Sequence, residues 1–280
     1  MLEIFIRQTI DLLKKSDIQF QRTEIMPITL IHETGVKQIN IQSKVSYSNV
    51  NLSDNLILQV MIMFTLLDAV IDSKYPNLEG KSFRSKYRNL PCDNDEELIF
   101  KEIYRLMKIF RNASVHSISA INFTGESVVI DYEYNNSVFK LEITKSGIGL
   151  LFAYILDSFE SRNDLTDNHI LAFRRSLYDH LISEIKEFSD DFKTNLQLIP
   201  SNQLRLKRSV RYQVRNPTYI IKGKDLIEIT SPYLSDQPNR GVDYLVEFKG
   251  KKALIPDEIL KNNQLSYREL NNWLILKKDS

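Results

Sequence analysis

Residues 94–116 read NDEELIFKEIYRLMKIFRNASVH, and this stretch predicts an amphipathic helix around which the first half of the chain folds. Acidic residues open the stretch, where the positive end of a helix dipole favours them. Apolar residues then recur at spacings that place them on one helical face: Ile99, Ile103, Leu106, Phe110 and Ala113. The last six residues of the predicted helix include an arginine, an asparagine and a histidine.

Those three polar residues are Arg111, Asn112 and His116. Asn112 and His116 are four residues apart and so neighbour each other on a helix, and the long Arg111 side chain can turn toward them. Arginine holds a phosphate through two parallel hydrogen bonds, and histidine, with an ordinary pKa of about 6.5, exchanges a proton at neutral pH. RNA cleavage without a metal requires these groups. The alternative is that His116 only complements the helix dipole.

The segments around this helix predict further helices and one hairpin. Apolar residues almost all round predict a buried helix over about 53–73, and helical spacing predicts another over 2–15. The Asn135-Asn136 pair predicts a turn between strands 127–134 and 137–144, followed by an apolar helix at 146–161. Residues 25–50 fit one or two short strands or an ordered loop, and residues 74–94 fit a polar connection.

The second half of the chain has a different character. One apolar stripe predicts a long helix over about 167–194, and short β-rich segments broken by proline and glycine follow Pro200, with a short helix near 256–263. We therefore expect an α+β fold in two domains. Residues 1–162 would form a mainly helical domain with a β-hairpin, and residues 163–280 an α+β domain.

Composition excludes several classes of protein. A single cysteine, Cys92, allows neither an internal disulfide nor a zinc site, and fits a cytoplasmic protein. The sequence has 8 glycines and none of the glycine-rich motifs of nucleotide-binding folds or α/β-hydrolases. No histidines lie at metal-ligand spacing, and no run of 18 apolar residues predicts a transmembrane helix. We expect no metal, no cofactor and no membrane contact.

A basic segment at 195–224 contains seven Lys and Arg residues and no acidic residue, although the whole chain carries a net charge of only +1. Tyr212 and Tyr219 lie among them. Basic side chains bind RNA phosphates and aromatic rings stack on bases, so five residues are candidates for RNA contact: Arg205, Lys207, Arg208, Arg211 and Arg215. The alternative is a solvated β-rich face that balances acidic helices elsewhere.

The motif Arg111-Asn112-x-x-x-His116, at the end of an amphipathic helix and after the apolar helix ending Leu67–Asp72, resembles the HEPN superfamily over about residues 1–161. The resemblance implies a metal-independent endoribonuclease that acts as a homodimer, in toxin–antitoxin or antiviral defence systems, with an antitoxin or regulatory protein as a further partner. Arg111 would then bind the scissile phosphate, His116 would be the general acid or base, and Asn112 would orient one of them. The products would carry 2′,3′-cyclic phosphates.

Other assignments remain open from the sequence. Some members of the family carry an acidic residue on an earlier helix, and Asp68 or Asp72 matches it, although an exposed or helix-ending carboxylate explains either one equally. Arg162-Asn163 followed by His169 repeats the motif, but reads as a loop and an N-cap. The strands at 127–144 and the residues beyond 163 depart from a minimal all-helical member. The rival function is a catalytically inactive HEPN-type module that binds RNA, a nucleotide or a protein, or regulates a larger assembly.

Overall fold

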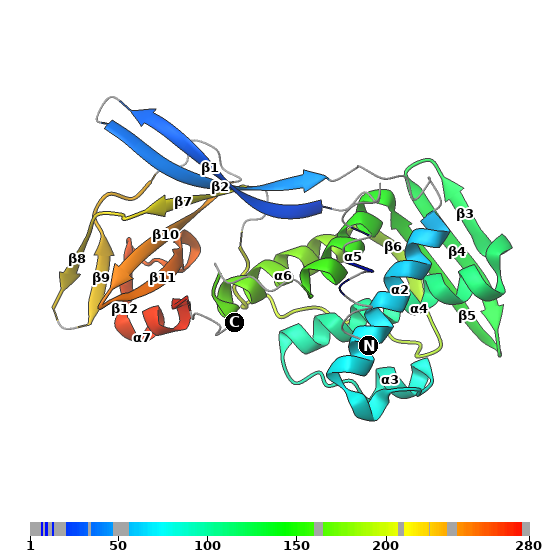
Figure 1. The fold of residues 1–280 in the computed structure, drawn as a ribbon. Helices are drawn as coiled ribbons and strands as arrows, with labels where there is room; N and C mark the ends of the chain where they lie inside the picture. Colours follow the sequence, from blue (N-terminus) through cyan, green and yellow to red (C-terminus); the bar gives the residue numbers. More distant parts are fainter. Residues whose placement is uncertain are drawn as a thin grey trace. The chain divides into compact units, whose positions relative to one another are not determined.

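The computed structural model describes residues 7, 9–10, 13, 21–32, 35–46, 56–159, 165–206, 210–223, 225–233 and 240–275. The chain divides into two compact units. Unit 1 comprises Met1–Gln21, Ser46–Phe159 and Leu177–Pro200, and unit 2 comprises Arg22–Val45, Glu160–Ser176 and Ser201–Ser280. Helices and sheets are both present, which confirms the α+β class (Figure 1).

Helix α4 (Asp95–His116) lies at the centre of unit 1 and matches the predicted helix. It begins where the Asn94 side chain accepts the backbone N–H of Glu97, a regular N-cap. Its apolar stripe is almost fully buried, with Ile99, Ile103, Leu106 and Ala113 at 0% exposure. The unit also contains, wholly or partly, α2 (Leu56–Lys74), α3 (Phe83–Asn89), α5 (Lys145–Asp157) and α6 (Asp167–Ser183). Single 3-10 turns lie at η1 (Pro76–Leu78) and η2 (Ile118–Ala120).

Helix α2 has the length and apolar composition to cross a bilayer, and it is the one such helix within the described residues. Buried core helices of soluble proteins have the same composition. Met63, Leu66, Leu67 and Ile71 are fully buried, so one face of α2 belongs to the core of unit 1.

The sheet of unit 1 is antiparallel, in the order β3 (Ile121–Thr124), β4 (Ser127–Tyr134), β5 (Ser137–Thr144) and β6 (Ile185–Ser189). The predicted hairpin is confirmed as β4–β5, and Asn135 and Asn136 take the positive φ angles of 49° and 59° that its two-residue turn needs. Alternate residues of β4 and β5, among them Ile130 and Leu141, face the core.

The predicted long helix over 167–194 is wrong in its last third. Helix α6 ends at Ser183, and β6 follows at once because its residues pair with β5, with Phe188 opposite Leu141. The apolar residues of this segment fit a strand as well as a helix, and pairing with a strand more than forty residues earlier decides between them.

Unit 2 contains two sheets (Figure 1). The larger has the order β1 (Gln21–His32), β2 (Gly35–Ser46), β7 (Val210–Arg215), β10 (Arg240–Phe248) and β11 (Lys251–Pro256), in which β7 and β10 are parallel. The smaller has the order β12 (Gln264–Ser266), β9 (Leu226–Ile229) and β8 (Tyr219–Lys222). The short helix α7 (Tyr267–Leu270) and the turns η3 (Asp257–Ile259) and η4 (Asn271–Trp273) complete it. Val246, Ile227 and Trp273 belong to its core.

The division into units differs from the expected boundary at 162/163. Residues 22–45 belong to unit 2, because β2 pairs with β7, while residues 177–200 belong to unit 1, because β6 pairs with β5. Local patterns do not reveal partners so distant in the sequence. The boundary itself and most of the predicted helix over 2–15 lie outside the described residues. The connection 74–94 contains α3, and the helix expected over 256–263 is only the turn η3.

Candidate active site

The three motif residues come together at the end of α4 through Arg111. Its guanidinium lies 3.1 Å from Asn112 Oδ1 and 3.3 Å from His116 Nε2. Because arginine only donates, Nε2 of His116 is the acceptor in this contact. The helix extends to His116 and is closed by the Ser117 N–H, which donates to Ala113 O. His116 is exposed, whereas Arg111 and Asn112 are half-buried, so the cluster opens to solvent.

A cavity of about 230 Å³ lies beside Arg111 and Asn112. Side chains from α2, α3 and α4 and from the segment between η1 and α3 form its wall: Phe64, Asp68, Lys81, Phe83, Tyr104, Lys108, Arg111 and Asn112. The motif therefore borders a concave surface that has both aromatic and charged walls.

Asp68 lies in the wall of this cavity, and Asp72 does not. Asp68 Oδ1 accepts from the Tyr104 hydroxyl at 2.7 Å and from Lys86 Nζ at 2.9 Å. Lys86 also lies 2.6 Å from Asp72. Burial alone would lower the pKa of Lys86, but its hydrogen bonds to Asp72 and Asp68 outweigh burial and raise that pKa. A cationic Lys86 thus offsets the negative charge of both carboxylates.

The remaining charges give the cavity a positive character. Lys108 is paired with Asp191. For Arg111 and Lys81, the described part of the chain supplies no carboxylate within ion-pair distance, although both line the cavity. Arg111 also acts on Tyr104: burial raises the pKa of the Tyr104 hydroxyl, and the Arg111 charge opposes that rise. An anion would therefore be attracted to the Arg111 end of the cavity.

Sequence reasoning missed the aromatic residues of the site. Tyr104 lies seven residues before Arg111, two helical turns away, and Phe64 lies one turn before Asp68. Helical spacing could have found both, but aromatic residues at such spacing normally indicate core. The hydroxyl of the β4 residue Tyr132 is buried and interacts with the Asn112 side chain. Burial raises the pKa of Tyr132 to about 12, and the Asn112 amide opposes that rise.

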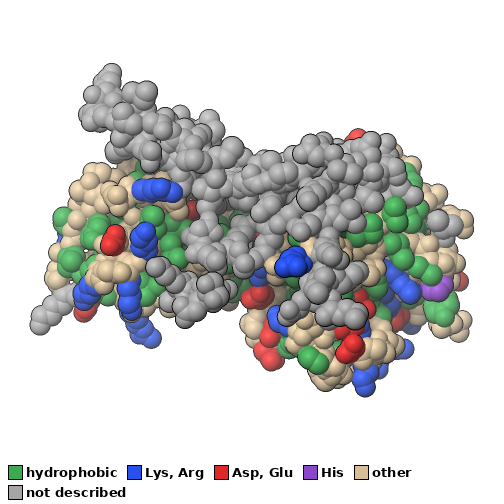
Figure 2. Space-filling view, viewed as in Figure 1, with side chains coloured by type: hydrophobic (Ala, Val, Ile, Leu, Met, Phe, Trp, Pro, Cys, Tyr) green, Lys and Arg blue, Asp and Glu red, His purple; other side chains and the backbone are tan. Residues whose placement is uncertain are grey.

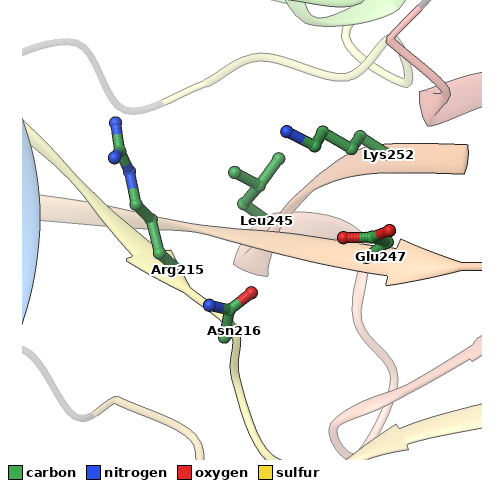
Figure 3. Close-up of a pocket in the computed structure, with 5 residues that line it drawn as sticks. All are labelled: Arg215, Asn216, Leu245, Glu247 and Lys252. Carbon is green, nitrogen blue, oxygen red and sulfur yellow. The ribbon is translucent and has the colours of Figure 1, made fainter.

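The three described basic candidates of unit 2, Arg205, Arg211 and Arg215, lie in different surroundings. Arg205 donates to the backbone oxygens of Ser201 and Gln203, and Lys207 and Arg208 lie outside the described residues. Arg215 lines a separate pocket of about 390 Å³ with Asn216, Leu245, Glu247 and Lys252. Figure 3 shows Arg215, Leu245 and Lys252 projecting from three adjacent strands on the same side of the sheet. Basic side chains prevail on the part of unit 2 visible in Figure 2, whereas both signs are interspersed over the helices of unit 1.

Arg211 must be removed from the RNA-binding candidates. It is only 1% exposed, and its guanidinium donates to Asp243 at 2.7–3.1 Å and to Glu258 at 2.6 and 2.7 Å. An enclosed guanidinium that is already paired cannot reach an RNA backbone. His169 lies in the same buried group, with Nε2 3.1 Å from Asp243 Oδ1, so it is a core histidine. Its supposed motif partners, Arg162 and Asn163, lie outside the described residues.

We expect unit 2 to lose stability in acid through Asp243. Burial would raise the pKa of this carboxyl, but the charges of His169 and Arg211 outweigh burial and hold it well below the ordinary value of 3.8. A depressed pKa in the folded state stabilises the fold above the ordinary pKa, and that contribution is lost as the pH falls below it. The single tryptophan, Trp273, is buried in unit 2, so its fluorescence reports this unit. Denaturant midpoints measured by Trp273 fluorescence should fall steeply below about pH 4. Midpoints that stay level down to pH 2 would contradict this role.

Comparisons with known proteins add no relative. No protein-family model matches the chain, and no curated protein or solved structure matches it. The assignment of a function therefore rests on the geometry of Arg111, Asn112, His116 and the adjoining cavity.

Proposed function

We propose that the protein is a metal-independent endoribonuclease of the HEPN type, with unit 1 as its HEPN-like domain. The observation that supports this most is the contact of the Arg111 guanidinium with both Asn112 and His116 at an exposed helix end. A permanent cation and a titratable imidazole, held a few ångströms apart at the surface, are the two groups that the transesterification of RNA requires.

In this reaction the ribose 2′-oxygen attacks the adjacent phosphorus, the bond from phosphorus to the 5′-oxygen breaks, and a 2′,3′-cyclic phosphate and a 5′-hydroxyl result. Arg111 stabilises the negative charge that builds on the phosphoryl oxygens. His116 in its imidazolium form donates a proton to the leaving 5′-oxygen and becomes neutral, and a second base accepts the proton of the 2′-hydroxyl. A neutral His116 of a second subunit is the natural source of that base, so we propose a composite site in a homodimer.

The same proposal extends to the cellular role. We propose that the enzyme acts in the cytoplasm as a toxin or antiviral defence effector, restrained by an antitoxin or regulatory protein. Arg205, Lys207, Arg208 and Arg215 remain candidates for a secondary contact with the RNA backbone, whereas Arg211 is buried in its own ion pairs. Asp68 enters as a residue of the cavity wall beside Arg111.

The proposal predicts that His116→Ala lowers the cleavage rate of single-stranded RNA or tRNA in EDTA by about 10²–10⁴-fold. The reason is that the substitution removes the proton donor and leaves Arg111 in place. The matched control is His180→Ala, because His180 is another exposed histidine of unit 1. Equal rates for the two variants would refute the site. RNA binding without cleavage by any form would favour the inactive binding module instead.

A further inference from the structure

We propose that the cavity beside Arg111 binds one unpaired RNA nucleobase carrying an amino group, next to the phosphate that is cleaved. This inference rests on the proposed function in one respect, which is that Arg111 holds that phosphate. The cavity adds the substrate preference that the motif alone does not give. Its aromatic wall, its acceptor and the cations that line it, Arg111 and Lys81, each support the inference.

The aromatic wall is built on Tyr104, which is 1% exposed and fixed by its hydrogen bond to Asp68. Phe64 lies nearly parallel to it, with ring centroids 5.9 Å apart and 12° between the planes. The Phe83 ring also packs against Tyr104, with the two ring centroids 4.5 Å apart. Phe64 and Phe83 are only partly buried and line the cavity, so they offer a surface on which a base can stack.

Asp68 supplies the acceptor. Both of its hydrogen bonds, from Tyr104 and Lys86, end on Oδ1, and within the described residues none ends on Oδ2. An amino group of adenine, cytosine or guanine can donate to that oxygen. Uracil has no amino group, and its N3–H lies between two carbonyl oxygens that a carboxylate repels. We therefore expect the cavity to discriminate against uracil.

The positive end of the cavity links the base to the reaction. Arg111 and Lys81 both line it, and the described residues include no carboxylate paired with either. A phosphate attached to the bound nucleotide can lie against these cations while the base lies against the rings. A cavity of about 230 Å³ suits a base splayed out from a single strand, which is how proteins usually read RNA sequence.

The test measures binding without cleavage. Fluorescein-labelled heptauridylate, and the same strand with one central cytidine, would be titrated in EDTA into the His116→Ala protein and followed by fluorescence polarisation. The two strands differ only in the hydrogen-bonding edge of one pyrimidine. We expect the cytidine strand to bind about tenfold more tightly, as for a hydrogen bond to a charged acceptor. Equal dissociation constants would overturn the proposal.

Variants then assign the preference to the cavity. Asp68→Asn should remove the difference between the two strands, and Phe83→Leu should weaken the cytidine strand about tenfold. Lys81→Ala should weaken both strands equally and reduce their salt dependence. Its control is Lys145→Ala, which removes one exposed charge of unit 1 outside the cavity lining and should change nothing. Discrimination that survives Asp68→Asn would contradict the assigned acceptor, even if Phe83→Leu fails to fold.

The two proposals can fail separately. If the wild-type protein does not cleave RNA but the cytidine strand is still preferred, the nuclease assignment is wrong and the base site stands. If the protein cleaves RNA through His116 but binds both strands equally, the nuclease stands and the base site is wrong.

Discussion

Asp190→Ala is expected to lower the free energy of unfolding of unit 1 by about 3–5 kcal/mol. Arg105 Nε and Nη2 donate to the two oxygens of Asp190 at 2.7 and 2.6 Å, and both residues are only 1% exposed. Removing the carboxylate leaves the buried Arg105 guanidinium without its main partner. The same guanidinium donates to Thr194 O, so the segment after β6 should also lose its anchor.

Denaturant unfolding followed by circular dichroism checks this expectation. The matched control is Asp131→Ala, which removes an exposed carboxylate of β4 that lies 3.7 Å from Lys140. Exposed pairs contribute about 0–1 kcal/mol, so this variant should unfold near the wild-type midpoint. If both variants shift the midpoint equally, the buried pair does not stabilise unit 1 as we argue.

The second large effect is on catalysis. Arg111→Ala should reduce RNA cleavage by about 10³-fold, because it removes the cation that faces the charge developing on the phosphate. It also removes the donor that bridges Asn112 and His116. Arg111→Lys should recover part of the rate, since lysine keeps the charge but loses the paired donors.

The control for this prediction is Arg88→Ala, because Arg88 is an exposed arginine of α3 that does not line the cavity. Rates of all variants are compared under single turnover, with circular dichroism as the check on folding. A loss for Arg88→Ala as large as that for Arg111→Ala would show that general basicity, and not the motif, determines activity.

The parts of the fold that the sequence predicts are those set by nearby residues. The apolar spacing of 99–113 predicts α4, and Asn135-Asn136 predicts the turn of the β4–β5 hairpin. The apolar stripe after Ser183 fits a helix or a strand, and only the distant partner β5 resolves it as β6. The pairing of β2 with β7 is likewise invisible locally.

The candidate site shows the same distinction between what nearby residues predict and what only the fold brings together. Helical spacing brings Asn112 and His116 to one face, and the Arg111 side chain turns to meet them as expected. The cavity is formed by residues of α2, α3 and α4 and of the segment between η1 and α3, so the sequence alone does not place Lys81 and Phe83 in the site. Arg211 shows the opposite error. A basic segment predicts a charged surface, but Arg211 of this segment is buried and paired with Asp243 and Glu258.

Mapping the ends of the RNA products in EDTA tests the central claim most directly. The account predicts 2′,3′-cyclic phosphates and 5′-hydroxyls from the wild-type protein, formation of both about 10²–10⁴-fold more slowly by His116→Ala, and no cleavage where a 2′-deoxynucleotide precedes the scissile bond. Products with 5′-phosphates and 3′-hydroxyls, or cleavage after a 2′-deoxynucleotide, would contradict it, because neither is possible when the 2′-oxygen is the nucleophile.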